Sequence, residues 1–207
     1  MHKLIIEFIG TFFLVLIVGL TVSSGSDFAG LAIGLGLVAL VFMGGHISGA
    51  HYNPAVTVGL IIRKAISPAE AGGYIAAQIL GGVAAGFITS MLVGSAITVA
   101  PGEGVSMVQC GLAELLFTFM LVSVVLNVAT SSDHDGNSFY GLAIGITVTA
   151  AAYSIGGISG AALNPAVITG QNLISGSLGN LPVYIGAQVI AGVLAGVVFK
   201  ITNPNEA

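Results

Sequence analysis

The chain of 207 residues contains few charges and a single cysteine. It has four Lys or Arg and eight Asp or Glu residues, so charged residues make up 6%, where a soluble domain has roughly a quarter. Four basic residues cannot form the positive patch that nucleic acids require, and we expect no nucleic-acid partner. Cys110 alone excludes an internal disulfide, and no group of His, Cys and carboxylate residues has metal-ligand spacing. No nucleophile–base pair indicates catalysis either, so we predict neither an enzyme nor a bound metal or cofactor.

Apolar residues fill most of the sequence, at 56% of the total. The first long run, Leu4 to Val22, would measure about 28 Å as a helix, which is enough to cross the hydrocarbon core of a bilayer. This length favours a transmembrane helix over a cleaved signal peptide. The predicted fold class is therefore an all-α polytopic membrane protein with six transmembrane helices. These spans are expected at residues 4–23, 28–46, 71–94, 108–130, 138–157 and 180–201.

Two shorter apolar runs, at residues 54–62 and 165–174, are long enough to reach only halfway across the bilayer. Both begin at an Asn-Pro-Ala tripeptide. Asparagine is a preferred helix cap and proline is favoured at the first helical position, so each tripeptide predicts the start of a re-entrant half-helix. The two boxes are Asn53, Pro54 and Ala55, and Asn164, Pro165 and Ala166.

The chain also contains an internal repeat. The segment from Gly45 to Gly59 recurs from Gly156 to Gly170 with ten of fifteen residues identical, at an offset of 164 − 53 = 111. Each half holds three spans, and an odd number of spans inverts the second half relative to the first. We therefore expect one channel domain, 1–207, in which the half-helices enter from opposite sides and meet near the bilayer centre. Its repeats are 1–100 and 105–207.

The basic residues indicate the orientation of the spans. Lys3, Arg63, Lys64 and Lys200 all fall on one side of a six-span topology, and Lys and Arg favour the cytoplasm. We thus expect a multi-pass protein of the cell (inner or plasma) membrane with both termini cytoplasmic.

Two acids lie within the spans, Glu7 and Glu114, at equivalent places in the two halves. An acid inside a membrane by default suggests a functional site. The interpretation that we favour is structural: each carboxylate accepts hydrogen bonds from the irregular backbone of a re-entrant loop, which must be satisfied at membrane depth.

With these features in hand, the chain resembles the aquaporin, or major intrinsic protein, family over its whole length. The resemblance rests on both Asn-Pro-Ala boxes, the loop from Ser48 to Thr57, the acid at the head of each half, and the pattern of six spans plus two half-helices. It implies a homotetramer in the lipid bilayer with one pore per subunit. It also implies that Asn53 and Asn164 donate hydrogen bonds to a solute at mid-pore, while the facing helix ends, each with about half a positive charge, repel cations and protons.

The outer constriction is where this sequence departs from that family. The family usually carries an arginine after the second box, and this chain has Val167. By the family's spacing, the other members of the ring are Ile33, Ala152 and Ala161, although Tyr153 could face the pore in place of Ala152 because one helical residue is about 100° of rotation. A ring without a cation or an aromatic predicts passage of water and leakage of small uncharged solutes such as glycerol, urea, ammonia or hydrogen peroxide.

Two histidines flank the first box, and the resemblance implies that His46 and His51 line or brace the cytoplasmic vestibule. They could gate the pore by protonation, or they could hold the loop by hydrogen bonds, which is the interpretation we favour.

Two further functions stay open at this point. A coupled secondary transporter also uses inverted repeats and broken helices, but Glu7 and Glu114 lie at the beginnings of spans rather than at mid-depth. A non-conducting or gated structural membrane protein could keep the same fold, because a purely apolar constriction can close by dewetting.

Overall fold

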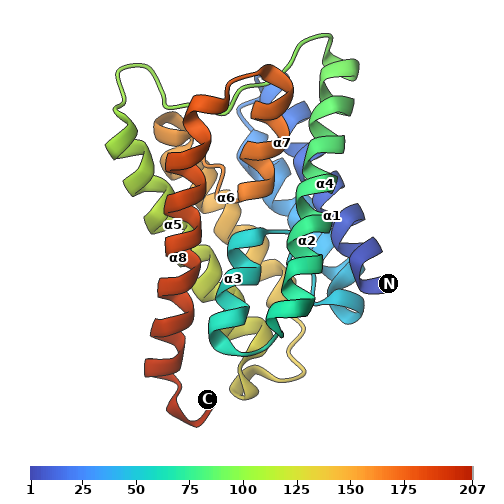
Figure 1. The fold of residues 1–207 in the computed structure, drawn as a ribbon, viewed down its shortest axis with the longest axis vertical. Coiled ribbons are helices and arrows are strands. Elements are labelled where there is room, and N and C mark those ends of the chain that lie inside the picture. The colour runs from blue at the N-terminus through green and yellow to red at the C-terminus, as the bar shows by residue number, and fades with distance from the viewer. Residues whose placement is uncertain (207) are drawn as a thin grey trace.

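The computed structural model describes residues 1–206, and all of its regular structure is helical. Six helices are long and apolar enough to cross a membrane, and two are short (Figure 1). The long helices are α1 (His2–Ser23), α2 (Ala29–Ser48), α4 (Pro68–Val93), α5 (Met107–Thr130), α6 (Tyr140–Ser159) and α8 (Leu181–Thr202), and the short ones are α3 (Pro54–Arg63) and α7 (Pro165–Ser175). Three single-turn 3₁₀ segments, η1 (Ser132–His134), η2 (Leu178–Asn180) and η3 (Pro204–Glu206), complete the described chain.

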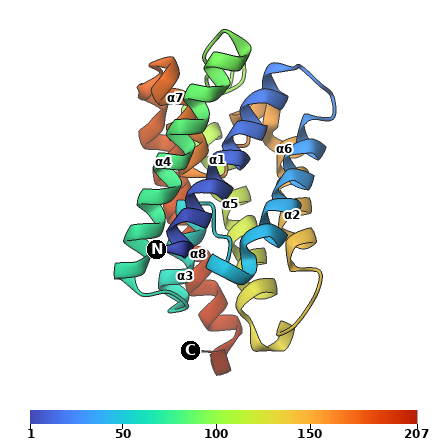
Figure 2. The same ribbon diagram turned by 90° about the vertical axis from the view of Figure 1, so that its right-hand side faces the viewer.

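The short helices occupy opposite ends of the bundle. In Figure 1, α3 lies in the lower half, below α7 in the upper half, and the loops that precede them approach each other in the middle. The long helices pack around them in pairs, α1 with α4, α5 with α8 and α2 with α6, and Figure 2 shows α1 beside α2 and α4. The fold class predicted from the sequence is confirmed.

Glycines allow the half-helices to touch the long helices at the backbone. A Cβ atom added at Gly82 of α4 would meet the carbonyl oxygen of Ala166 in α7, and one added at Gly192 of α8 would meet that of Ala55 in α3. Small residues at such crossings are how membrane helices approach closely. The same kind of contact therefore joins each half-helix to a long helix of the other half of the repeat.

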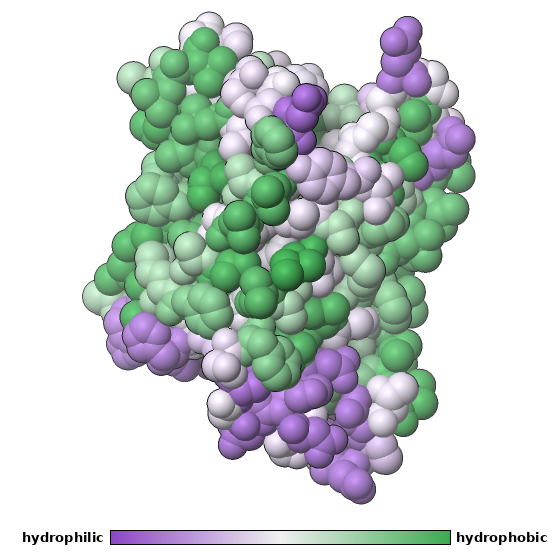
Figure 3. Space-filling model, turned by 180° about the vertical axis from the view of Figure 1, so that it is seen from behind, coloured by the Kyte–Doolittle hydropathy of each residue, from purple (hydrophilic) through white to green (hydrophobic). Residues whose placement is uncertain are grey.

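The outer surface fits a bilayer. Large apolar side chains such as Leu80, Leu112 and Ile146 are more than half exposed, and the face in Figure 3 shows an apolar middle band with polar residues gathered at the ends. A soluble protein of this size would hide such a surface, whereas lipid tails solvate it. The chain is thus a multi-pass membrane protein.

The observed helix ends lie within three residues of the predicted ones, and local caps explain the differences. The largest shift is at α4, predicted from residue 71 and observed from Pro68. The hydroxyl of Ser67 accepts a hydrogen bond from the backbone N–H of Glu70, and Pro68 occupies the first helical position, so the helix begins before its apolar run does.

Candidate pore

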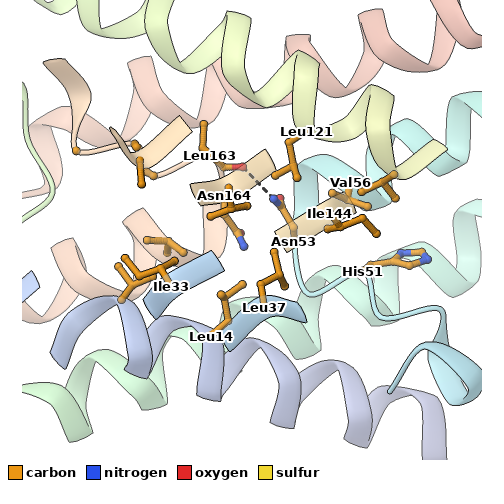
Figure 4. Close-up of a pocket in the computed structure, with 18 of the residues that line it drawn as sticks. Leu14, Ile33, Leu37, His51, Asn53, Val56, Leu121, Ile144, Leu163 and Asn164 are labelled. Atoms are coloured by element: carbon orange, nitrogen blue, oxygen red, sulfur yellow. Dashed lines mark hydrogen bonds between the residues drawn. The ribbon is translucent and has the colours of Figure 1, made fainter. Parts of the chain in front are cut away.

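An elongated cavity of about 70 Å³ runs between the two half-helices and the faces of four long helices. Figure 4 shows its lining, with the two box asparagines side by side at its centre. The wall built by the long helices is apolar. The polar groups come from the two loops and the box asparagines. Residues of the apolar wall include Leu14, Val18, Ile33, Leu37, Leu121, Val125, Ile144, Val148 and Ala152.

Each box asparagine caps its half-helix. The side-chain oxygen of Asn53 accepts from the backbone N–H of Ala55 at 2.8 Å, and that of Asn164 accepts from Ala166 at 2.8 Å. Both asparagines have extended backbone and the proline that follows begins the helix. The two positive helix ends thus face the centre of the cavity, as the resemblance implies.

The amide nitrogens of the same side chains tie the two halves together. Asn53 Nδ2 donates to the carbonyl oxygen of Leu163, and Asn164 Nδ2 donates to that of Tyr52, both at 2.9 Å (Figure 4). An amide nitrogen carries two hydrogens, but within residues 1–206 each of these two nitrogens has only one protein acceptor. One N–H per asparagine is therefore left for a solute in the cavity.

The loops before the boxes have an unusual backbone, and it is the same in both halves. Ala50 and Tyr52 have φ angles of 50° and 49°, and the equivalent Ala161 and Leu163 have φ angles of 48° and 53°. Residues other than glycine adopt this left-handed conformation at a cost of about 1–3 kcal/mol each, so surrounding groups must hold it.

In the first half, the carboxylate of Glu7 holds the loop. It accepts hydrogen bonds from the hydroxyl of Ser48 at 2.6 Å, from the backbone N–H groups of His51 at 3.0 Å and Tyr52 at 2.8 Å, and from the amide of Gln78 at 2.8 Å. Glu7 is fully buried. Its position and partners are those of a loop support.

Glu114 holds the second loop with the same set of bonds. It accepts from Ser159 at 2.6 Å, from the backbone N–H groups of Ala162 at 2.9 Å and Leu163 at 2.8 Å, and from Gln188 at 2.7 Å. It is also fully buried. Neither acid lines the cavity, so neither offers a site for a coupling ion in the permeation path.

The four residues expected at the outer constriction all line this cavity. Ile33 comes from α2, Ala152 from α6, Ala161 from the second loop and Val167 from the first turn of α7. None has a side chain that donates a hydrogen bond or carries a charge. The structure therefore brings them together on a stretch of wall that is apolar except for backbone groups.

Tyr153, the alternative to Ala152, points away from the cavity. Its side chain is 57% exposed, and its hydroxyl donates to the carbonyl oxygen of Asp27 at 3.1 Å. Ala152 occupies the lining position, so a methyl group rather than a phenol ring faces the cavity there.

The two histidines of the expected vestibule line different spaces. His51 lines the central cavity, where its ring packs against Tyr74 at 4.8 Å between centroids. His46 lines a second, larger cavity of about 700 Å³, together with His134, Asp135 and other residues of the α5–α6 connection. That connection lies at the lower end in Figure 1.

Sequence reasoning missed most of the apolar wall. Leu14 and Val18 on α1, Leu121 and Val125 on α5, and Ile144, Val148 and Ala152 on α6 are each four residues apart and share a helix face. Counting in fours from Ala152 would have found two of them. The rest follow only from how the helices are rotated, which an apolar sequence does not reveal.

A pore lined by four of the six membrane-spanning helices, with two half-helices meeting at its middle, defines this protein as a membrane channel. The sequence matches the Major intrinsic protein family over residues 1–199, and the chain belongs to that family. Channels of this family pass water and small solutes passively, so this protein is a passive channel and not an enzyme.

Individual relatives agree with this assignment. The chain is 37% identical to the glycerol uptake facilitator protein-like 6 of Lactiplantibacillus plantarum, with both chains covered in full. It is 33% identical to aquaporin AqpM of Methanothermobacter thermautotrophicus over 96% of each. The fold is similar to that of the aquaglyceroporin from Plasmodium falciparum, with a TM-score of 0.80, 22% identity, and coverage of 98% of this chain and 94% of that one.

Proposed function

We propose that this channel conducts water together with small uncharged solutes, through an outer constriction formed by Ile33, Ala152, Ala161 and Val167. The observation that carries this proposal is the lining of the cavity, where these side chains provide neither a charge nor an aromatic ring. Solutes of the size of glycerol, urea, ammonia and hydrogen peroxide are the candidates. The similarity to a protein named as a glycerol uptake facilitator supports this range.

Ions and protons are excluded at the centre of the pore. The N-termini of α3 and α7 each present about half a positive charge there. The free N–H groups of Asn53 and Asn164 orient a passing water molecule as an acceptor, which interrupts proton relay along the water file. An accelerated collapse of a pH gradient in sealed proteoliposomes would contradict this part of the proposal.

The channel works as a homotetramer in the cell membrane, with the lower end of Figure 1 in the cytoplasm. Arg63 ends α3, Lys64 follows it, and Lys200 lies in the last turn of α8. Both helices end toward the lower end of Figure 1, and these basic residues support the orientation. His46 then lines the cytoplasmic vestibule, with His51 deeper in the pore.

The experiment that tests the constriction is stopped-flow light scattering on proteoliposomes. Water flux is measured with an impermeant osmolyte, and solute flux with glycerol, urea and methylammonium gradients. Val167→Arg places a charged donor in the ring and is expected to reduce solute flux at least tenfold while water flux falls less. Val167→Leu adds volume without a donor and separates size from charge.

Water flux no faster than that of empty liposomes, for folded wild-type protein, would overturn the proposal. The apolar ring would then be dry, and the non-conducting or gated structural protein would be the better description. Solute flux that required an ion gradient would instead favour the coupled transporter.

A further inference from the structure

The two loops share their backbone conformation, but only the first takes part in a chain of side-chain hydrogen bonds. The first loop carries His51 and, on the following half-helix, Thr57. At the same places the second half has Ala162 and Ile168, at the offset of 111. The first half therefore has a side-chain hydrogen-bond chain that starts at the cavity, and the second half cannot form one.

The chain in the first half has three links. His51 Nδ1 lies 3.1 Å from Thr57 Oγ1, Gln78 Nε2 lies 3.0 Å from Thr57 Oγ1, and Gln78 Nε2 lies 2.8 Å from Glu7 Oε2. Thr57, Gln78 and Glu7 are all fully buried. The imidazole that faces the solute is thus connected to the buried loop support.

The direction of each bond follows from which atoms can donate. The carboxylate of Glu7 accepts, so the amide nitrogen of Gln78 must face it, and that nitrogen's second hydrogen points to Thr57 Oγ1. The hydroxyl proton of Thr57 has oxygen acceptors of its own, Asn53 O at 3.1 Å and Gln78 Oε1 at 3.4 Å. The lone pair that remains on Thr57 then accepts from His51, whose Nδ1 carries the hydrogen.

We propose that Thr57 is a positioning residue that fixes His51 in the Nδ1–H tautomer, so that Nε2 faces the permeating solute as a hydrogen-bond acceptor. Nε2 has no protein partner within residues 1–206, and it is not among the enclosed, unpaired polar atoms. This inference deepens the proposed function and rests on it, because it assumes that solutes pass through the cavity that His51 lines.

The tautomer decides which solutes the inner half of the pore favours. The N–H groups of Asn53 and Asn164 serve solute acceptors, and the Nε2 lone pair of His51 serves solute donors a short distance further along. A molecule with several N–H or O–H donors, such as urea, gains from this arrangement more than water does. The opposite tautomer would present a third donor and no side-chain acceptor.

The second half shows what becomes of the hydrogen-bond chain when the hydroxyl of Thr57 is missing. There Gln188 donates to Glu114, as Gln78 does to Glu7, but its side-chain oxygen is buried without a partner. Ala162, in place of His51, offers nothing to orient. Thr57 and His51 therefore form a hydrogen-bonded pair that is confined to the first half.

The test combines a spectroscopic and a flux measurement on the full-length protein in liposomes. Solid-state ¹⁵N NMR with labelled histidine reports which ring nitrogen of His51 is protonated, with His51→Gln used to assign its signals among the four histidines. The wild type is expected in the Nδ1–H form. Thr57→Val, of the same shape without the hydroxyl, should shift the population toward Nε2–H, and Thr57→Ser should restore the wild-type signal.

The flux arm measures the ratio of urea to water permeability. Thr57→Val is expected to lower this ratio about two- to tenfold, the range of one neutral hydrogen bond, and Thr57→Ser to restore it. Ile168→Thr, the matched change in the second half, should leave the ratio and the His51 signals unchanged, because no imidazole stands beside it.

The outcomes separate this inference from the proposed function. An Nε2–H signal in the wild type, or an Nδ1–H signal that survives in Thr57→Val, overturns the role of Thr57 whether or not the channel conducts. The expected tautomers with an unchanged flux ratio would overturn the link to selectivity. Absence of any flux would reject the proposed function while leaving the tautomer measurement readable.

Discussion

The two Asn-Pro-Ala loops have the same backbone and different walls. Left-handed residues, an asparagine cap, a buried glutamate and a glycine contact recur at equivalent positions. The side chains that differ between the loops include His51 and Ala162, and Tyr52 and Leu163. The comparison teaches that the repeat preserves the groups that build the pore, among them the solute-facing Asn53 and Asn164, whereas single lining positions such as His51 and Ala162 differ. Such differences make the two halves of the pore chemically unequal.

The two mouths of the molecule are held by different chemistry. At the lower end in Figure 1, the guanidinium of Arg63 bonds the carboxylate of Glu206 at 2.7 Å and the carbonyl oxygen of Thr130 at 3.0 Å. At the upper end, the neutral amide of Asn172 exchanges two hydrogen bonds with the backbone of Val99, at 2.8 and 2.9 Å. One mouth depends on charge and the other does not.

The largest expected effect tests whether the two loops depend equally on their carboxylates. Glu7→Ala and Glu114→Ala each leave four donors without an acceptor, and three of the four donor residues around Glu7 and all four around Glu114 are buried. Unsatisfied buried donors cost about 1–3 kcal/mol each, so either variant should lose several kcal/mol and most of its folded yield. Size-exclusion chromatography and thermal unfolding in detergent measure this.

Similar losses in both variants would support the equivalence of the halves. If Glu7→Ala folded normally while Glu114→Ala did not, the first loop would be held by the His51 and Thr57 chain instead, and the comparison would need revision.

Much of this architecture could be predicted from the sequence, because helix starts and repeats are local signals. The boxes at Asn53 and Asn164 specify caps that form in the structure, and apolar length specifies spans. The lining of the pore could not be predicted fully, because Leu37 and Ile144 look like any other apolar residue in their spans. Hydrophobic periodicity fails in a membrane protein, since lipid-facing and core-facing sides are equally apolar.

A smaller effect is expected at the glycine contacts. In Gly82→Ala and Gly192→Ala the new methyl group would press on the carbonyl oxygen of a half-helix, and overpacking of this kind typically costs about 1–3 kcal/mol. Gly72→Ala is the matched control on α4, because a Cβ there meets nothing within 4 Å, and alanine favours the helix by about 1 kcal/mol. The midpoint temperature of thermal unfolding should therefore fall for the first two variants and stay the same or rise for the control.

A difference between the two glycine variants would show which half-helix has room to shift. If Gly82→Ala were as stable as Gly72→Ala, α7 could move away from α4 at no cost, and the tight crossing would not anchor it.

The smallest effect concerns the two mouths and depends on pH. Hydrogen bonds from Ser132, together with the nearby charge of Arg63, lower the pKa of the Glu206 carboxyl below its ordinary value. A lowered pKa means that the contact stabilises the folded state above the ordinary pKa of about 4.5, and that this contribution is lost as the pH falls through the folded-state pKa. Glu206→Gln should therefore reduce Tm at pH 7 by no more than about 3 °C, and the difference from wild type should vanish in acid.

Asn172→Ala tests the upper mouth in the same way, because the hydrogen bonds to Val99 that it removes involve no titrating group. Its loss of Tm should be the same at pH 7 and in acid, since both partners of the bond are neutral across this range. A Tm difference for Glu206→Gln that stayed constant with pH would mean that the lower mouth is held by the backbone contacts of the segment around η3 rather than by the ion pair with Arg63. In that case both mouths would be held by neutral hydrogen bonds, and the ion pair at the lower mouth would not contribute to stability.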